Sequence, residues 1–447
     1  MTGRAYITAV GAFLPGEPVS NADLEATLGQ VNGKASRSMG PVLRSNGITS
    51  RYYAINRETG EPSYSSAAMA ANAVRQLATD AFALEDIDCL ACGTSLPEQM
   101  LPNIGSMVHA ELALPAIEVV ATSGVCLSGV AAMKYAMLGV KAGEFQHAVA
   151  VASERASGAL RGRFFNSDSD ASPTEFVKRP SLAFEKDFLR FMLSDGAGAV
   201  LIEPQPAKTG LSMRMEWILG RSYANEMDTC MYAGAEKTAD GSLKSWMDFA
   251  PEEWLTRSVF AIKQDAKQLN EHIIRFTVEA GLREVMRTRH LDPDSVTWFL
   301  PHYSSMYFRD KVLAGMQRVG FVIPQERWFT NLTTKGNTGS ASIYIMLEEL
   351  FHSGRMKIGD RLLCFVPESG RFSTGYVLLT VCGPDSVAGD PVGPDLDTPS
   401  APTPSTALPS APTPSTALPS APTSSTAVPS APTPSTALPS VATPLAK

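Results

Sequence analysis

Three side chains of this 447-residue sequence are of the types needed to form a carbon–carbon bond from acyl thioesters: Cys126, His302 and Asn337. A cysteine thiolate can accept an acyl group from a carrier thioester. A second thioester must then become a carbanion at its α-carbon. Histidine and asparagine can donate hydrogen bonds to the enolate oxygen as its charge develops, and this electrostatic stabilisation is usually the largest catalytic contribution. The three residue types together indicate a condensing activity.

The sequence around Cys126 predicts a sharp turn from a strand into a helix. Residues 117–121 are mostly β-branched and apolar, as in a buried strand, and residues 131–138 are rich in strong helix formers. Amide N–H groups are unpaired at a helix start, and the helix dipole favours negative charge there. We therefore expect the thiol of Cys126 to lose its proton easily. The alternative is a small buried cysteine that only packs a helix against a sheet.

The candidate site residues fall at the carboxyl ends of predicted strands or in turns that open helices: Cys126, Glu154, His302, Asn337 and Gly370. Chemistry in open α/β sheets gathers at the carboxyl ends of the strands. We expect the backbone N–H groups of Cys126 and Gly370 to stabilise the oxyanion of a tetrahedral intermediate.

The two halves of the chain repeat one order of elements. A small-residue turn, a helix, a glycine-containing turn and a strand run from Cys126 to Glu154, and the same order runs from Asn337 to Pro367. The predicted fold class is α/β, with duplicated units whose parallel strands are covered by helices.

We place the boundaries of the expected domains at 1–205, 206–385 and 386–447. The last segment repeats Pro, Ala, Ser and Thr with a period of ten, and this composition predicts a disordered tail. Residues 156–190 and 205–260 are irregular insertions. Aromatic side chains of the second insertion are expected at a substrate entrance: Trp217, Tyr223, Tyr232, Trp246 and Trp254.

Composition argues against several classes of protein. The formal net charge is −7 without a long basic run, so a nucleic-acid partner is not expected. No apolar run is long enough to span a membrane, and the first residues lack the apolar core of a signal peptide, so we expect a cytoplasmic enzyme. Cys89 and Cys92 form a CxxC pattern, but no second pair of ligands completes a metal site. We expect no metal and no resident cofactor.

Four segments resemble, in order, motifs of the ketoacyl synthase III family of the thiolase superfamily: Thr122–Gly129, Ser194–Val200, Pro301–His302 and Gly336–Ser342. The resemblance runs from about residue 5 to 382. It implies two interlocked halves in α-β-α-β-α layers, a homodimer, and acyl groups carried on acyl carrier protein or coenzyme A. It also implies that Cys126, His302 and Asn337 form the catalytic set.

A further stretch, Arg44–Arg51, is similar to an arginine-containing segment of the family. The resemblance implies that Arg44 and Arg51 contact the phosphate of the carrier. A solvated polar loop is the alternative for this segment.

The sequence departs from the housekeeping members of the family in three respects. Glu368–Phe372 replaces a triple glycine, Glu154 replaces a smaller or shorter polar residue, and the chain has the two insertions. These features are similar to ketosynthases that join two thioesters and close a ring to give dialkylresorcinols or cyclohexanediones. Glu154 is a candidate base for ring closure. The alternative is a strand-end carboxylate paired with Arg155 or Arg371.

Three other functions stay open. An ordinary ketoacyl synthase III would make linear β-ketoacyl chains, and an acyltransferase of the same fold would deliver the acyl group to oxygen or nitrogen. A non-catalytic partner subunit would be expected to lack Cys126, His302 or Asn337, and all three are present.

Overall fold

The computed structural model describes residues 3–31, 33–164 and 187–386. Their centre is a nine-stranded sheet in the order β13-β14-β15-β8-β1-β7-β6-β4-β5. The strands are β1 (Tyr6–Phe13), β4 (Cys89–Thr94), β5 (Glu118–Ser123), β6 (Ala148–Glu154), β7 (Gly196–Glu203), β8 (Ser212–Ser222), β13 (Trp298–Pro301), β14 (Arg361–Glu368) and β15 (Ser373–Cys382). The predicted repeat tail and most of the 156–190 insertion lie outside the described residues.

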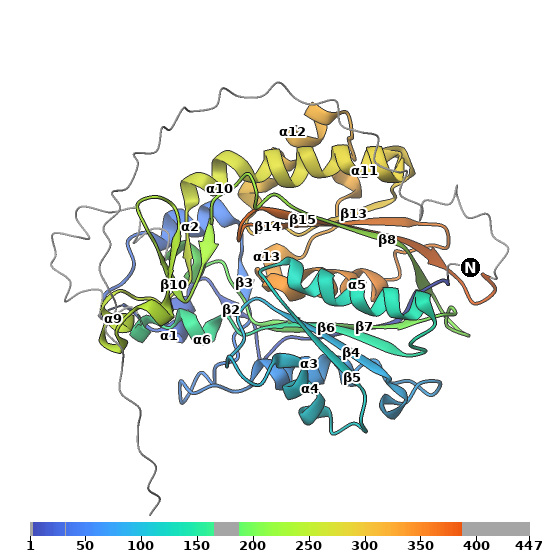
Figure 1. Ribbon diagram of the computed structural model, residues 1–447, viewed down its shortest axis with the longest axis horizontal. Helices are drawn as coiled ribbons and strands as arrows, with labels where there is room; N and C mark the ends of the chain where they lie inside the picture. The colour runs from blue at the N-terminus through green and yellow to red at the C-terminus, as the bar shows by residue number, and fades with distance from the viewer. Residues whose placement is uncertain (1–2, 32, 165–186, 387–447) are drawn as a thin grey trace, which may run out of the picture. The chain divides into compact units, whose positions relative to one another are not determined.

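The elements stack in five layers, as Figure 1 shows from top to bottom. The upper helices cover β13, β14, β15 and β8, the middle helices lie between the two groups of strands, and the lower helices cover β4 to β7. The helices are α10 (Ala266–Ile273), α11 (Gly281–Arg289) and α12 (Arg309–Val319) above, α5 (Leu127–Ala142) and α14 (Ser342–His352) in the middle, and α3 (Ser66–Arg75) and α4 (Ile104–Leu112) below. The prediction of a thiolase-like fold in α-β-α-β-α layers is confirmed.

The two halves have matching topology, but the sheet is mixed rather than parallel throughout. β4 pairs in parallel with β6, which pairs antiparallel with β7. In the same way, β13 pairs in parallel with β14, which pairs antiparallel with β15. A short turn between β14 and β15 allows only an antiparallel pair. β6 and β14 therefore hold the same position in their halves.

A π-helical segment, Ile274–Ala280, connects α10 to α11. The carbonyl of Thr277 in this segment accepts hydrogen bonds from the hydroxyls of Thr374 (2.9 Å) and Tyr376 (3.0 Å) on β15. A π-helical segment does not keep the regular α-helical hydrogen bonds between residues four apart. The two hydroxyls therefore provide partners for the carbonyl of Thr277.

The 205–260 insertion divides into two parts. Its first part is β8, where Trp217 is buried in the central sheet, so the expectation that Trp217 lies at a substrate entrance is wrong. Its second part is a small lobe of short elements in which Trp246, Trp254 and Phe260 pack edge to face or tilted. The elements are β9 (Met231–Tyr232), β10 (Ala235–Lys237), β11 (Leu243–Ser245), α9 (Pro251–Thr256) and β12 (Lys263–Gln264).

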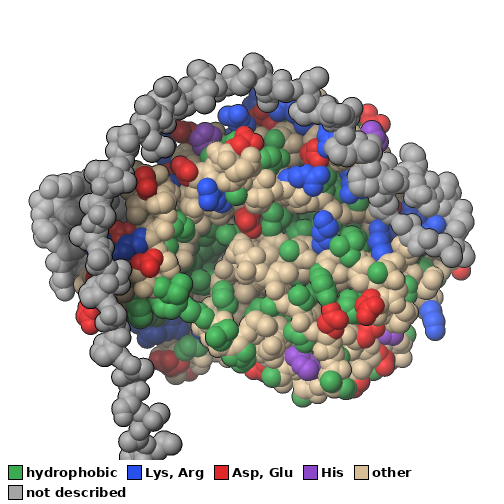
Figure 2. Space-filling model, in the orientation of Figure 1, with side chains coloured by type: hydrophobic (Ala, Val, Ile, Leu, Met, Phe, Trp, Pro, Cys, Tyr) green, Lys and Arg blue, Asp and Glu red, His purple; other side chains and the backbone are tan. Residues whose placement is uncertain are grey.

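Among the described helices, none combines the length and the apolar character that crossing a bilayer requires. On the face drawn in Figure 2, basic and acidic side chains are interspersed rather than gathered into one patch of a single sign. This face therefore shows no broad field that would attract a polyanion.

Candidate active site

The predicted turn from strand to helix at Cys126 is confirmed. β5 ends at Ser123, Cys126 is the N-cap residue of α5, and Gly124 between them has φ 150°, which favours glycine. The other five cysteines are buried, so Cys126 is the one cysteine with appreciable accessible surface. The turn thus places Cys126 at the border of the core, where it is partly exposed.

A second turn of the same kind carries Asn337 before α14. Gly336 and Gly339 have φ of 72° and 53°, so both need the freedom of glycine. The Oδ1 atom of Asn337 accepts a hydrogen bond from the N–H of Gly339 (2.9 Å). Because a backbone N–H can only donate, this bond fixes the side-chain amide and leaves the two Nδ2 hydrogens free to donate.

The starts of the two central helices touch. A Cβ atom at Gly129 of α5 would lie 2.5 Å from the carbonyl oxygen of Ser340, so only glycine fits there. The hydroxyl of Tyr344 on α14 donates to the carbonyl of Gly129 (2.7 Å). Small residues in both turns therefore bring the Cys126 turn and the Asn337 turn together.

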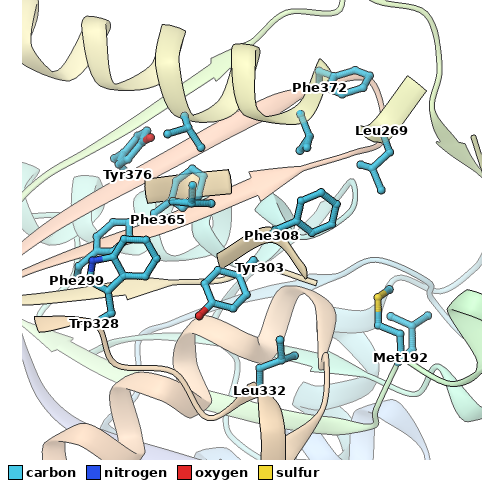
Figure 3. Close-up of a cluster of buried hydrophobic side chains, with 14 of the residues drawn as sticks. Met192, Leu269, Phe299, Tyr303, Phe308, Trp328, Leu332, Phe365, Phe372 and Tyr376 are labelled. Carbon is cyan, nitrogen blue, oxygen red and sulfur yellow. The ribbon is translucent and has the colours of Figure 1, made fainter. Parts of the chain in front are cut away.

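Cys126, His302 and Asn337 line one cavity with about 920 Å³ of empty space, part of it open to solvent. Much of the remaining wall is apolar and comes from α10, the π-helical segment and α12: Leu269, Ile273, Ile274, Val278 and Val312. Figure 3 shows pocket-lining side chains from several parts of the chain, among them Met192, Leu269, Tyr303, Phe308 and Phe365. The structure thus brings the three distant candidates to one apolar pocket.

His302 follows β13, and its backbone N–H donates to the carbonyl of Phe365 on β14 (2.8 Å). The side chain is 4% exposed. Burial lowers the pKa of His302 to about 4, so the imidazole is neutral near pH 7. A neutral imidazole can both donate and accept a hydrogen bond.

Comparison with known proteins gives consistent matches. Residues 286–379 match the family model for the 3-oxoacyl-[acyl-carrier-protein] synthase III C terminal. The β-ketoacyl-[acyl-carrier-protein] synthase III of Chlamydia pneumoniae is 23% identical over 379 residues, covering 84% of this chain and 96% of the relative. A second relative, β-ketoacyl-[acyl-carrier-protein] synthase III 2 of Deinococcus radiodurans, is 25% identical over 358 residues, covering 80% of this chain and 89% of the relative.

Solved structures share the fold. The 3-oxoacyl-[acyl-carrier-protein] synthase III of Aquifex aeolicus superposes with a TM-score of 0.59 at 20% identity, covering 84% of this chain and 99% of that structure. AbyA1, a tetronic acid condensing enzyme, gives 0.65 at 18% identity with 84% and 99% coverage. OleA of Xanthomonas campestris gives 0.61 at 17% identity with 85% and 99% coverage.

The chain is thus similar to ketoacyl synthase III proteins along most of its length, and its residues 286–379 match their C-terminal family model.

Glu154, the last residue of β6, lines the same pocket and is 4% exposed. Its Oε1 atom accepts hydrogen bonds from the N–H of Ser95 (2.7 Å), the N–H of Ser340 (3.2 Å) and the hydroxyl of Ser340. Its Oε2 atom accepts none from the described residues. Burial raises the pKa of Glu154, while the bonds from Ser340 and Ser95 lower it.

The alternative pairing of Glu154 with an arginine is wrong. Arg155 forms an ion pair with Glu98 (Nε–Oε1 2.6 Å), and Arg371 donates its Nε–H to the carbonyl of Met227 (2.7 Å). Both guanidinium groups are therefore committed elsewhere, and the partners of Glu154 are serine hydroxyl and backbone N–H groups.

The contacts of Glu368 with the Cys126 turn were not expected from the sequence, where this residue is only a departure from the family pattern. The Oε2 atom of Glu368 accepts hydrogen bonds from the N–H groups of Val125 and Leu127, each 3.0 Å long. Burial raises the pKa of the Cys126 thiol, and the carboxylates of Glu368 and Glu154 raise it further. The expectation that Cys126 loses its proton easily is therefore wrong for the empty pocket. An acidic residue in place of glycine was the available signal.

Gly370 lies in the turn between β14 and β15, and this turn packs against the Cys126 turn. A Cβ atom there would lie 3.1 Å from Cγ2 of Val125. Its carbonyl accepts from the N–H groups of Cys230 and Met231, at 2.9 and 3.2 Å. Within the described residues, the N–H groups of Gly370 and Cys126 donate to no other residue, so both are free to bind an oxyanion.

The Arg44–Arg51 segment is not one exposed loop. Arg44 is exposed near the end of α2 (Met39–Asn46). Arg51 is fully buried, and its guanidinium donates to Oδ1 of Asn21 (2.6 Å) and to the carbonyl of Phe191 (2.8 Å). The expected contact of Arg51 with a carrier phosphate is therefore wrong, because its donors point into the core.

The small lobe contributes to the pocket through residues other than its aromatic ones. Met231, Ile262 and Gln264 line the cavity. Four of the aromatic residues expected at the entrance do not line it: Tyr223, Tyr232, Trp246 and Trp254. Met231 lies in β9, Gln264 in β12 and Ile262 just before β12, so this part of the lobe forms its share of the pocket wall.

Proposed function

We propose that this chain is a condensing enzyme that joins two acyl thioesters through an acyl-cysteine intermediate. The observation that carries this proposal is the single pocket lined by Cys126, His302 and Asn337. The family comparisons support it, since the relatives named above are β-ketoacyl-[acyl-carrier-protein] synthases. The acyl groups arrive as thioesters of acyl carrier protein or coenzyme A.

In the first step the sulfur of Cys126 attacks the carbonyl carbon of a thioester. The bond from that carbon to the carrier sulfur breaks, and a new bond to Cys126 forms. Neutral His302 accepts the thiol proton and returns it to the leaving sulfur, so the products are S-acyl-Cys126 and free carrier thiol. The free N–H groups of Cys126 and Gly370 stabilise the transient oxyanion.

In the second step another thioester forms an enolate by releasing carbon dioxide, and the electron pair of the broken carbon–carbon bond remains on the α-carbon. His302 and the Nδ2 hydrogens of Asn337 donate hydrogen bonds to the enolate oxygen. The carbanion attacks the carbonyl carbon of S-acyl-Cys126, the new carbon–carbon bond forms, and the thiolate of Cys126 leaves. The thiolate is then protonated again, which restores the starting enzyme.

The acyl chain lies along the apolar wall of the pocket. Leu269, Ile273 and Val278 present aliphatic side chains there, and Phe308 adds an aromatic surface. Transfer of methylene groups from water to such a wall contributes roughly 0.8 kcal/mol for each buried CH₂. The wall thus favours an alkyl chain over a short polar acyl group.

Ring closure is the finer part of the proposal. A dialkylresorcinol or cyclohexanedione product needs one more proton abstraction and addition after condensation. The Oε2 atom of Glu154 is the base we assign to this step, since its partner oxygen carries all three hydrogen bonds. Burial raises the pKa of this carboxyl, which makes its anion a stronger base. A homodimer in the cytoplasm completes the proposal.

The experiment supplies carrier-bound thioesters to the purified chain and to Glu154→Gln. Glu154→Gln keeps an oxygen for Ser95 and Ser340, so we expect normal loading of Cys126 but no cyclic product. Glu326→Gln, an exposed carboxylate outside the pocket, is the matched control. An unchanged cyclic product from Glu154→Gln would remove this residue from the mechanism.

The wild-type products separate the remaining functions. A linear β-ketoacyl product would identify an ordinary ketoacyl synthase III. An ester or amide made without a new carbon–carbon bond would identify an acyltransferase of the same fold.

A further inference from the structure

Glu368 bridges two parts of the chain that meet only in the fold. It is the last residue of β14, and its Oε2 atom accepts from the backbone N–H groups on both sides of Cys126 (3.0 Å each). These N–H groups belong to the start of α5, where a helix favours an anion. Glu368 therefore occupies the donors that would otherwise favour a negatively charged sulfur.

The contact is one of a reciprocal pair. Glu154, the last residue of β6, accepts from the N–H and the hydroxyl of Ser340 in the Asn337 turn. β6 and β14 hold the same position in the two halves, as their pairing shows. In each half, a strand thus ends in a glutamate whose carboxylate accepts hydrogen bonds from the turn of the other half.

The glycines of both turns make room for these carboxylates. A Cβ atom at Gly124 would lie 3.4 Å from Oε2 of Glu368, and a Cβ atom at Gly339 would lie 3.0 Å from Cγ of Glu154. Both glycines also have positive φ. The close approach of carboxylate and turn is therefore a built feature of both sites.

The turn that carries Glu368 is itself fastened on its other side. The hydroxyl of Ser369 accepts from Nε2 of Gln264 (3.0 Å), and the carbonyl of Gly370 accepts from the N–H of Cys230 (2.9 Å). Arg371 donates to the carbonyl of Met227. These bonds fasten the turn that follows Glu368 to the small lobe and to the residues before it.

We propose that Glu368 is a positioning residue, which fixes the Cys126 turn and holds a negative charge beside its sulfur while the pocket is empty. Burial of the sulfur and this charge together raise the pKa of the thiol and favour its neutral form. A carboxylate beside the sulfur disfavours a second negative charge. A neutral thiol reacts slowly with electrophiles and oxidants, because the thiolate is the reactive form. Cys126 therefore stays unreactive towards solutes until a thioester fills the pocket. The catalytic role of Cys126 rests on the proposed function, but the ionisation of its thiol can be measured without it.

The test measures the alkylation of Cys126 by iodoacetamide between pH 6 and 10, with the modified peptide quantified by mass spectrometry. Glu368→Gln keeps a side-chain oxygen for Val125 and Leu127 but removes the charge. We expect the midpoint of the pH dependence of the alkylation rate to fall by about one pH unit in this variant. At a fixed pH below the midpoint, alkylation should therefore be about tenfold faster. The rate at high pH should stay unchanged, since the turn keeps its hydrogen bonds.

Two variants serve as controls. Glu326→Gln removes an exposed carboxylate outside the pocket and should leave the midpoint unchanged. Glu368→Asp keeps the charge but shortens the side chain, so it should keep a midpoint close to that of the wild type and lower the rate at high pH. An unchanged or raised midpoint in folded Glu368→Gln would overturn the proposal.

The wild type alone gives an independent test if Glu368→Gln fails to fold. Its midpoint should lie above the ordinary value for a free cysteine, about 8.5. A midpoint at or below that value would overturn the proposal without any variant. The alkylation needs no acyl substrate, so its failure is distinguishable from a failure to form S-acyl-Cys126, which would contradict the proposed function instead.

Discussion

The turns that open α5 and α14 hold equivalent places in the two halves but carry different chemistry. The first presents Cys126 and the second presents Asn337. Each turn is held by a carboxylate from the other half, Glu368 for the first and Glu154 for the second. The scaffold is thus repeated, whereas the functional side chains are not.

The two turns differ in whether the side chain that they carry can ionise. Glu368 bonds to N–H groups on both sides of Cys126 and opposes ionisation of the sulfur. In the other half, Asn337 is a neutral donor, and burial alone lowers the pKa of His302 and keeps it neutral. We infer that the Cys126 turn serves a group whose charge changes during the reaction, while the Asn337 turn supplies a donor whose charge stays constant.

The largest expected effect comes from removing the group that changes charge. Cys126→Ala should form no acyl-enzyme and should lose activity by a factor of about 10⁴ or more, since none of the other described cysteines lines the pocket. Release of carrier thiol and the mass of the Cys126 peptide measure the two effects. Activity of this variant within tenfold of the wild type would mean that the first turn has no covalent function.

Removing the neutral donor of the second turn should have a smaller and different effect. Asn337→Ala should still load Cys126 but should condense about 10²–10³-fold more slowly, the usual cost of one lost donor to a developing oxyanion. Single-turnover measurements with preloaded enzyme isolate the second step. Equal slowing of loading and condensation would show that the two turns do not divide the steps between them.

The titration of His302 should appear in the stability of the protein. Its pKa is about 4 when folded, below the ordinary value of 6.5. The unfolded chain therefore binds the extra proton first, and the wild type loses stability as the pH falls from 6.5 towards 4. Relative to His302→Asn, which does not titrate there, the loss should reach up to about 3 kcal/mol. Denaturant unfolding at pH 7, 5 and 4 measures it, and a constant difference would contradict the assignment.

The contact between the two turns predicts the smallest effect. Gly129→Ala places a Cβ atom 2.5 Å from the carbonyl oxygen of Ser340, so it should destabilise the protein by about 1–3 kcal/mol. Gly220→Ala on β8 is the matched control, since a Cβ atom there meets nothing within 4 Å. Thermal unfolding of both variants makes the comparison. Equal stability of the two would show that the turns are less closely packed than described.

Local sequence predicted the parts of the site that have local causes. β-branched residues before Cys126 and helix formers after it define one turn, and the glycines around Asn337 define the other. The strand that ends before His302 was visible for the same reason. The duplicated order of elements then predicted two similar α/β units, whereas the α-β-α-β-α layers were implied by the family resemblance.

The remaining features depend on contacts between residues that lie far apart in the sequence. The bonds of Glu368 join residues 241 and 243 positions apart, and Arg51 is satisfied by Phe191, 140 positions away. The helix start alone predicts a lowered pKa for the thiol of Cys126, whereas burial and two carboxylates supplied by the fold raise it. Burial of the sulfur is the first cause of this shift, and the charges from distant segments add to it.

The most direct test of the central claim is peptide mass spectrometry of the wild type and Asn337→Ala after incubation with one acyl thioester and no second substrate. The account predicts the acyl mass on Cys126 in both proteins, at equal occupancy. An acyl group on a different residue, or on no residue, would contradict it.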